Sequence, residues 1–175
     1  MAVDIWNGVG NWNVDLADWS LGAAPTALTD ALIQSGTDSL TSAGTAGLVT
    51  IVSTATLFLT SAASLGATGL SNYGTFNVGT NFADGGIGVS ISGTLANFGS
   101  FTLGVSSLSA STTVTVGHLA NTGAISLVGN QGLGTTNQAT LNVTSAAPAT
   151  LTGSVSLFGD SDLEFASGAV TTIWR

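Results

Sequence analysis

Apolar and polar residues alternate in short stretches along this chain, and one such stretch returns at a regular interval. Residues 70–79, with the sequence LSNYGTFNVG, recur as LANFGSFTLG at 95–104, as LANTGAISL at 119–127 and more loosely at 151–157. The aligned glycines are spaced by 25, 24 and 30 residues, and they are Gly74, Gly99, Gly123 and Gly153. An internal period of this size is typical of solenoid proteins, in which each repeat forms one coil.

Each repeat contains a second alternating stretch, so we expect two or three short strands per coil. The apolar positions of this second stretch are Val89 and Ile91, Val114 and Val116, Leu141 and Val143, and Leu163 and Phe165. A single repeat cannot bury the apolar face of either strand, but stacked repeats form a continuous core. We therefore predict two columns of stacked core residues, Phe76–Phe101–Ile125–Val155 and Val78–Leu103–Leu127–Leu157.

The recurrence of identical residues favours parallel, in-register pairing between coils over a meander of hairpins. In that register Asn72, Asn97 and Asn121 form a ladder of side-chain amides at a turn, as stacked asparagines do in cross-β assemblies. The glycines Gly74, Gly99 and Gly123 form a second structural ladder at the same turn. A charged residue would meet its own copy about 4.8 Å away, which favours neutral Ser, Thr and Asn at repeated positions.

The N-terminal part lacks this period and is rich in tryptophan. It contains Trp6 and Trp12 within the string WNGVGNW, followed by Trp19-Ser20 and Pro25. This string resembles the opening cap of many bacterial extracellular β-helix modules. Together with the repeated coils, the chain resembles a parallel β-helix segment of a large bacterial surface or autotransporter-type adhesin. The resemblance implies a fold and an extracellular or cell-surface location, but it names no ligand.

We therefore predict one all-β domain over residues 1–175, a right-handed parallel β-helix (β-solenoid). Residues 1–36 form a Trp-rich N-terminal cap, and residues 37–175 form stacked coils. The expected stack has about six coils and is roughly 30 Å long at about 4.8 Å per coil. Residues 129–138 lengthen one repeat and should protrude as a loop. Terminal coils expose apolar core, so we expect Trp6, Trp12, Trp19 and, at the other end, Trp174 to act as lids.

Composition supports the all-β prediction and excludes several kinds of partner. The chain has 26 Thr, 24 Gly and 21 Ser, but few residues that favour helices. Its net charge is -8 and its only cation among Lys and Arg is Arg175, so it cannot neutralise a row of phosphates. No apolar run approaches the roughly 18 residues of a membrane helix, so we expect no membrane insertion. Without cysteine, the chain has neither disulfides nor a thiolate metal site.

Few residues suggest chemistry. His118 is the only imidazole and lacks a nucleophile motif, so we interpret it as a residue at a coil corner. Asp160, Asp162 and Glu164 are weak ligand candidates: with Leu163 in the core, Asp162 and Glu164 point outward about 7 Å apart. That separation suits paired glycosidase carboxylates, and Asp-x-Asp is also a weak calcium signal. We expect neither a cofactor nor a metal, and we interpret the cluster as a solvated face.

Two further surface features have structural interpretations. The Thr-x-Thr pairs do not recur at fixed positions, so β-propensity explains them better than ice binding does. Tyr73 and Phe98 are expected to form a partly exposed stacked pair, which stabilises a solenoid without any ligand.

Three functional hypotheses remain. The first is a structural and adhesive extracellular module without catalysis. The second is a protein that binds or cleaves polysaccharide, and the third is a subunit of a self-assembling fibre. The possible partners are accordingly surface glycans or other copies of the chain.

Overall fold

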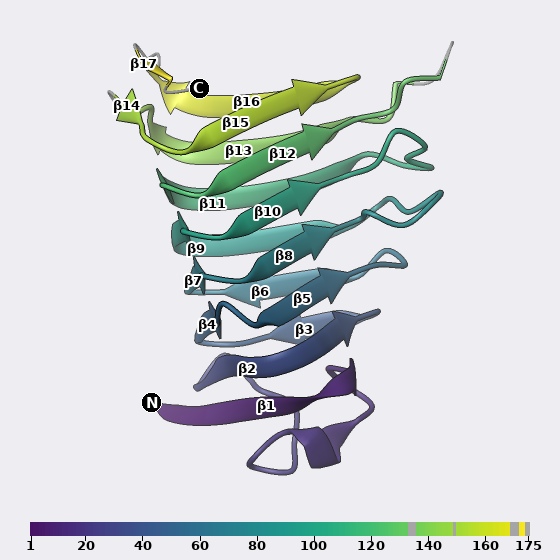
Figure 1. The fold of residues 1–175 in the computed structure, drawn as a ribbon, viewed down its shortest axis with the longest axis vertical. Helices are drawn as coiled ribbons and strands as arrows, with labels where there is room; N and C mark the ends of the chain where they lie inside the picture. The colour runs from purple at the N-terminus through teal and green to yellow at the C-terminus, as the bar shows by residue number, and fades with distance from the viewer. Residues whose placement is uncertain (133–135, 149, 169–171, 174–175) are drawn as a thin grey trace.

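The protein is a stack of β-coils. The computed structural model describes residues 1–132, 136–148, 150–168 and 172–173. Parallel strands wind through about seven turns of a β-solenoid. The nearer strands run from left to right as the chain climbs, and paler strands return behind them, so the coils are right-handed (Figure 1). The predicted fold class is confirmed, whereas the predicted number of coils, about six, is too low by one.

A complete coil has three walls, and each strand pairs with its counterparts in the neighbouring coils. The first wall contains β4 (Leu48–Ile51), β7 (Gly69–Asn72) and the C-terminal parts of β9 (Gly88–Asn97) and β11 (Thr112–Asn121). The second wall contains β5 (Ala55–Leu59), β8 (Thr75–Val78), β10 (Ser100–Leu103), β12 (Ala124–Val128) and β15 (Ser154–Phe158).

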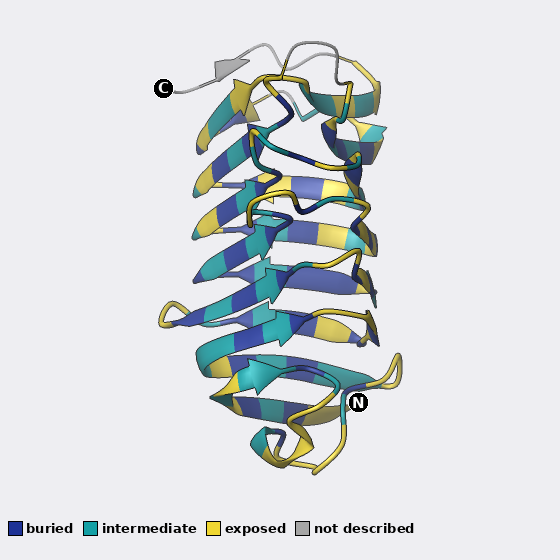
Figure 2. Ribbon diagram, turned by 90° about the vertical axis from the view of Figure 1, so that its right-hand side faces the viewer, coloured by how far each residue is buried: buried dark blue, intermediate teal, exposed yellow. Residues whose placement is uncertain are grey.

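The third wall closes each coil. It contains β3 (Ala43–Thr45), β6 (Ser64–Ala67), the N-terminal parts of β9 and β11, β13 (Ala139–Ala146) and β16 (Ser161–Ser167). The short strands β14 (Thr150–Leu151) and β17 (Thr172–Ile173) form a separate parallel pair. Buried and exposed residues alternate along the strands of all three walls (Figure 2), as period-2 side chains require.

The core columns follow the predicted register. Phe76 pairs with Phe101, which pairs with Ile125, which pairs with Val155. The neighbouring column, Val78–Leu103–Leu127–Leu157, has the same register. Most members of both columns are almost completely buried, so the repeated apolar positions do form the core.

The first turn lies inside the region predicted as a cap. Strand β1 (Ala2–Asn11) pairs in parallel with β2 (Thr29–Leu40), and both strands bend through the first two walls. The apolar positions of β1 follow no repeat, so the sequence pattern missed this turn. Residues 12–28, which include the 3-10 helix η1 (Leu16–Asp18), take the place of the third wall and fold below β1 (Figure 1).

The three N-terminal tryptophans fill the end of the core. Trp19 packs edge-on against both Trp6 and Trp12, with ring centroids 5.2 and 5.0 Å apart, and all three side chains are buried. An antiparallel bridge joins Trp6 to Trp19, and the Trp19 Nε1 donates to the Trp12 carbonyl at 3.0 Å. These residues form the predicted lid, whereas Trp174 lies outside the described residues.

The C-terminal end is more open. Within the described residues β15 pairs only with β12, and β16 pairs only with β13. Leu157 is 47% exposed, although Leu127 and Leu103, its equivalents in the two preceding coils, are completely buried. Of residues 169–175, only Thr172 and Ile173 are described, and they form β17. In the described part of the chain, no helix has the length and apolarity needed to cross a membrane.

Candidate functional site

The asparagines predicted as a ladder lie on the first wall in register with one another. Asn72 pairs with Asn97, which pairs with Asn121, and all three side chains are buried. The Nδ2 of Asn72 donates to the Oδ1 of Asn97 at 2.8 Å, and the Nδ2 of Asn97 donates to the Oδ1 of Asn121 at 2.7 Å. Buried amides need such partners because an unpaired polar group in a core is destabilising.

Aliphatic residues stand at both ends of this ladder. Ile51 pairs with Asn72 on one side. Leu151 lies three residues before Ser154, as Asn121 lies three before Ala124, the partner of Ser154. The ladder therefore ends where no amide follows, and the Oδ1 of Asn72 has no hydrogen-bond partner. The same column thus accommodates both amides and aliphatic side chains.

The three ladder glycines allow the backbones of successive coils to approach closely at the turn. A Cβ atom on Gly99 would overlap the carbonyl oxygen of Gly74, and one on Gly123 would overlap that of Gly99. A Cβ on Gly74 would likewise overlap two carbonyl oxygens of the preceding turn. Space, rather than backbone dihedral angle, therefore requires glycine here.

Two aromatic pairs flank the glycines. Phe76 and Phe101 stack inside the core with centroids 5.1 Å apart, and Tyr73 and Phe98 stack outside with centroids 4.7 Å apart. Tyr73 and Phe98 are 50% and 46% exposed. Each outer ring covers one face of the other, so the stacking stabilises the corner without any ligand.

The acidic candidates lie at the C-terminal end of the third wall. In β16, Asp162 is opposite Thr140 and Glu164 is opposite Asn142, while Leu163 packs against the core. The carboxylates therefore point outward. The Oδ2 of Asp162 accepts from the Nε2 of Gln138 at 3.3 Å. Asp160 is exposed in the turn before β16. No group of three or more His, Cys, Asp or Glu side chains in the described ranges is arranged to hold a metal ion.

His118 lies apart from these carboxylates. It is exposed, and it follows a register shift in β11 that marks the bend between two walls. Its partner in β9, the strand of the preceding coil, is Thr94. This placement gives the imidazole no orienting carboxylate among its paired residues.

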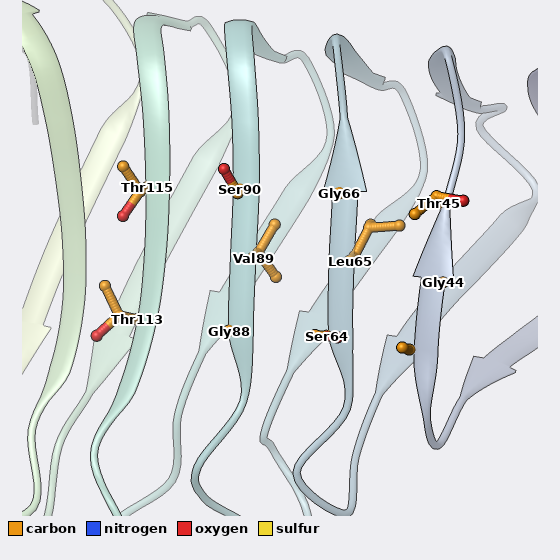
Figure 3. Close-up of a pocket in the computed structure, with 11 residues that line it drawn as sticks. Gly44, Thr45, Ser64, Leu65, Gly66, Gly88, Val89, Ser90, Thr113 and Thr115 are labelled. Carbon is orange, nitrogen blue, oxygen red and sulfur yellow. The ribbon is translucent and has the colours of Figure 1, made fainter. Parts of the chain in front are cut away.

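A shallow trough of about 480 Å³ runs across the third wall. Small side chains from four neighbouring strands line it (Figure 3), and they include Thr113 and Thr115, from the segment considered for ice binding. Gly66 and Gly88 make the trough by leaving two positions without side chains. None of the residues that line the trough is titratable, so their side chains offer hydroxyl groups and apolar surface. The lining residues are Ala43, Gly44, Thr45, Ser64, Leu65, Gly66, Gly88, Val89, Ser90, Thr113 and Thr115.

Three aspartates are buried, which the sequence pattern did not predict. Asp4 accepts from Ser20 Oγ and the Leu21 amide, both at 2.9 Å. Asp84 accepts from Thr60 Oγ1 at 2.7 Å and from two backbone amides. Asp38 is completely buried, and neither of its carboxyl oxygens has a hydrogen-bond partner. The alternation could have revealed Asp38, because it shares the parity of the core residue Leu40.

No family model matches the chain, and neither a curated protein nor a solved structure is detectably similar to it.

Proposed function

We propose that this chain is a rigid structural and adhesive module of a bacterial secreted or surface protein, without catalysis of its own. The observation that carries the proposal is the continuous parallel pairing from β1 to β16, with the same columns repeated through successive coils. Each added coil lengthens such a stack by about 4.8 Å without changing its cross-section. A chain built in this way is suited to hold whatever is attached to it at a fixed distance.

The outer surfaces of the middle coils support the same proposal. Residues 85–159 contain no Asp, Glu, Lys or Arg. The outward positions of the second wall carry mainly Thr, Ser and Asn, and the trough on the third wall has no titratable residue. The bacterial extracellular setting rests on the resemblance of the Trp-rich opening and the repeated coils to surface adhesins.

Distance measurements between spin labels test the rigidity. The chain has no cysteine, so Val9→Cys and Ser154→Cys place one label near each end at exposed positions. We expect a single narrow distance distribution by pulsed electron spin resonance. As a control, Val9→Cys with Leu28→Cys places both labels near the N-terminal end. A broad or bimodal distribution for the long pair alone would contradict a rigid module.

The outward carboxylates of Asp162 and Glu164 support a second candidate, a polysaccharide-binding or polysaccharide-cleaving protein. A screen of neutral and acidic glycans with the parent chain, Asp162→Asn and Glu164→Gln tests it. We expect no turnover by any of the three. Turnover that both substitutions abolish would replace the structural proposal with an enzymatic one, and Asp160→Asn provides a matched acidic control.

The unpaired edges of β15 and β16 support a third candidate, a self-assembling fibre. Head-to-tail polymers should then grow with concentration in light scattering at neutral pH. We expect a constant particle size instead, because residues 12–28 fold against the opposite end and bond part of the β1 edge through Trp19 and Ser20. Growth of particle size with concentration would favour the fibre.

A further inference from the structure

Asp38 occupies a position that later coils fill with apolar residues. In β2 it pairs with Gly10 of β1 on one side and with Leu57 of β5 on the other. The same column continues through Phe76 and Phe101. Asp38 is completely buried, and both carboxyl oxygens lack a hydrogen-bond partner. A carboxylate in such surroundings is strongly destabilised relative to a neutral carboxyl group.

The groups that face Asp38 offer it no positive charge. Leu57 above it is apolar, and Gly10 below it has no side chain. The carboxyl group of Asp15 occupies the space beside Gly10, because a Cβ atom there would overlap Asp15 Oδ2. Asp18 lies in the same way beside Gly8, with its Cγ 2.5 Å from where a Cβ would be. Two further acidic side chains of the cap therefore face the buried carboxyl group.

These surroundings determine how Asp38 titrates. Burial raises its pKa to about 8, and the negative charges of Asp15 and Asp18 act in the same direction. The Ser39 backbone N–H lowers this pKa in part, although it makes no hydrogen bond of acceptable geometry with the carboxyl group. In the closed structure Asp38 therefore keeps its proton at neutral pH. Once the cap opens and water reaches it, the same group ionises at its ordinary, much lower pKa.

Two features connect Asp38 to the cap. Asp15 and Asp18 belong to residues 12–28, which cover the first coil, and Asp15 Oδ2 also accepts from the Asn11 amide at 2.6 Å. Trp12, two residues beyond Gly10 on the same inner face, is buried with its Nε1 unpaired. At this end of the core, the carboxyl group of Asp38 and the Nε1 of Trp12 are therefore buried without hydrogen-bond partners. Opening of the cap hydrates all of them.

We propose that Asp38 is a proton-controlled latch: protonated Asp38 lets residues 12–28 close over the first coil, and ionised Asp38 releases them. The predicted direction follows from linkage. The closed state binds a proton up to about pH 8, whereas the open state releases it near the ordinary aspartate pKa of about 4. Between these values the open state binds fewer protons, so rising pH favours opening, by about tenfold per pH unit.

The test is the accessibility of the cap tryptophans as a function of pH. Acrylamide quenching is measured in a Trp174→Phe background, so that only Trp6, Trp12 and Trp19 report. The parent should show quenching that increases between about pH 4 and pH 8 with the dependence of a single proton and then levels off. Asp38→Asn should remove this dependence because the amide cannot ionise, and Asp162→Asn, a surface control, should leave it unchanged.

Two further variants keep the proposal falsifiable. Asp15→Asn removes a like charge near Asp38. The pH at which the increase in quenching ends should therefore be lower than in the parent. Asp38→Leu places an aliphatic residue in a column that is apolar elsewhere, and it should fold with a closed cap at every pH even if Asp38→Asn does not fold. Equal pH profiles in the parent and in both Asp38 variants would overturn the latch, as would tryptophans that stay shielded in the parent at about pH 9.

Discussion

The first coil and the middle coils share one backbone arrangement but use different side-chain rules. In the middle, each column repeats the same kind of residue, as in the asparagine, glycine and phenylalanine ladders. At the N-terminal end, Gly10 is followed by Asp38 and then Leu57 in one column. Repetition stabilises the middle coils because each residue of a column packs against residues of the same kind in the coils on both sides. The end has only one neighbouring coil and is held by individual contacts of residues 12–28.

This difference predicts how far along the stack a substitution lowers stability. A substitution in a middle column removes contacts with the coils on both sides, so it should lower the free energy of unfolding of the whole stack. A substitution in the cap should affect mainly the first coil. Four substitutions test this contrast, and the loss of stability that we expect decreases from the first to the last.

Phe101→Ala should have the largest effect on the middle coils. Phe101 is completely buried and stacks on Phe76, so we expect a loss of about 4 kcal/mol in the free energy of unfolding. Phe98→Ala removes a ring of the same size from the exposed stack and should cost only about 1 kcal/mol. Chemical denaturation of both variants measures the difference. Similar losses would mean that the outer pair is as important to the fold as the inner one.

Gly99→Ala tests the close approach of successive coils. The new Cβ would overlap the Gly74 carbonyl oxygen, so the backbones must separate, and we expect a loss of about 3 kcal/mol. Gly88→Ala is the matched control, because a Cβ at Gly88 has no atom within 4 Å. That control should change the free energy of unfolding by less than about 0.5 kcal/mol. A tolerated Gly99→Ala would show that the glycine ladder is dispensable.

Asn97→Leu tests whether the amide ladder acts as a unit. The substitution removes the partner of Asn121 Oδ1 and one of the two acceptors of Asn72 Nδ2, which keeps the Ser100 carbonyl. We expect a loss of about 2 kcal/mol. Changing all three asparagines to leucine leaves no orphaned amide, and Ile51 and Leu151 already show that aliphatic residues fit this column. The triple variant should therefore lose less than three times the single loss. Strict additivity in denaturation would contradict a coupled ladder.

Asp4→Asn should have the smallest effect, and one confined to the cap. It weakens the hydrogen bonds from Ser20 Oγ and the Leu21 amide, so we expect a loss of about 1 kcal/mol. Hydrogen exchange should become faster in residues 19–21 and stay unchanged in β8 and β10. Faster exchange throughout the middle coils would show that the two regions unfold together and would remove the distinction between them.

The contrast also explains which features could be predicted. The middle coils repeat, so one alignment of residues 70–79 with 95–104 is enough to place the core columns, the asparagine ladder and the parallel register. Strand β1 has no such partner in sequence, because most of its column neighbours in β2 are of a different type and only Gly8 and Gly36 are identical. Its pairing depends on residues 12–28 folding back to cover it, and no local pattern encodes that contact.

The candidate sites divide in the same way. The alternation around Leu163 correctly places Asp162 and Glu164 outside, and the spacing of Tyr73 and Phe98 gives their stacking. Neither pattern shows that the stacking covers one face of each ring, nor that Gly66 and Gly88 hollow the third wall. Both features depend on which coils become neighbours.

The amino-acid sequence is enough to specify the solenoid, because its period, its neutral coils and its alternating apolar positions all require in-register stacking. The surroundings of the acidic residues at the N-terminal end, in contrast, depend on how the chain folds. Four aspartates lie within the first 30 residues and look alike in sequence, as does Asp38. Asp4 finds donors from Ser20 and Leu21, whereas Asp38 faces Leu57 and the carboxyl of Asp15. The ionisation of a carboxyl group depends on the water and charge around it, and folding alone brings those neighbours together.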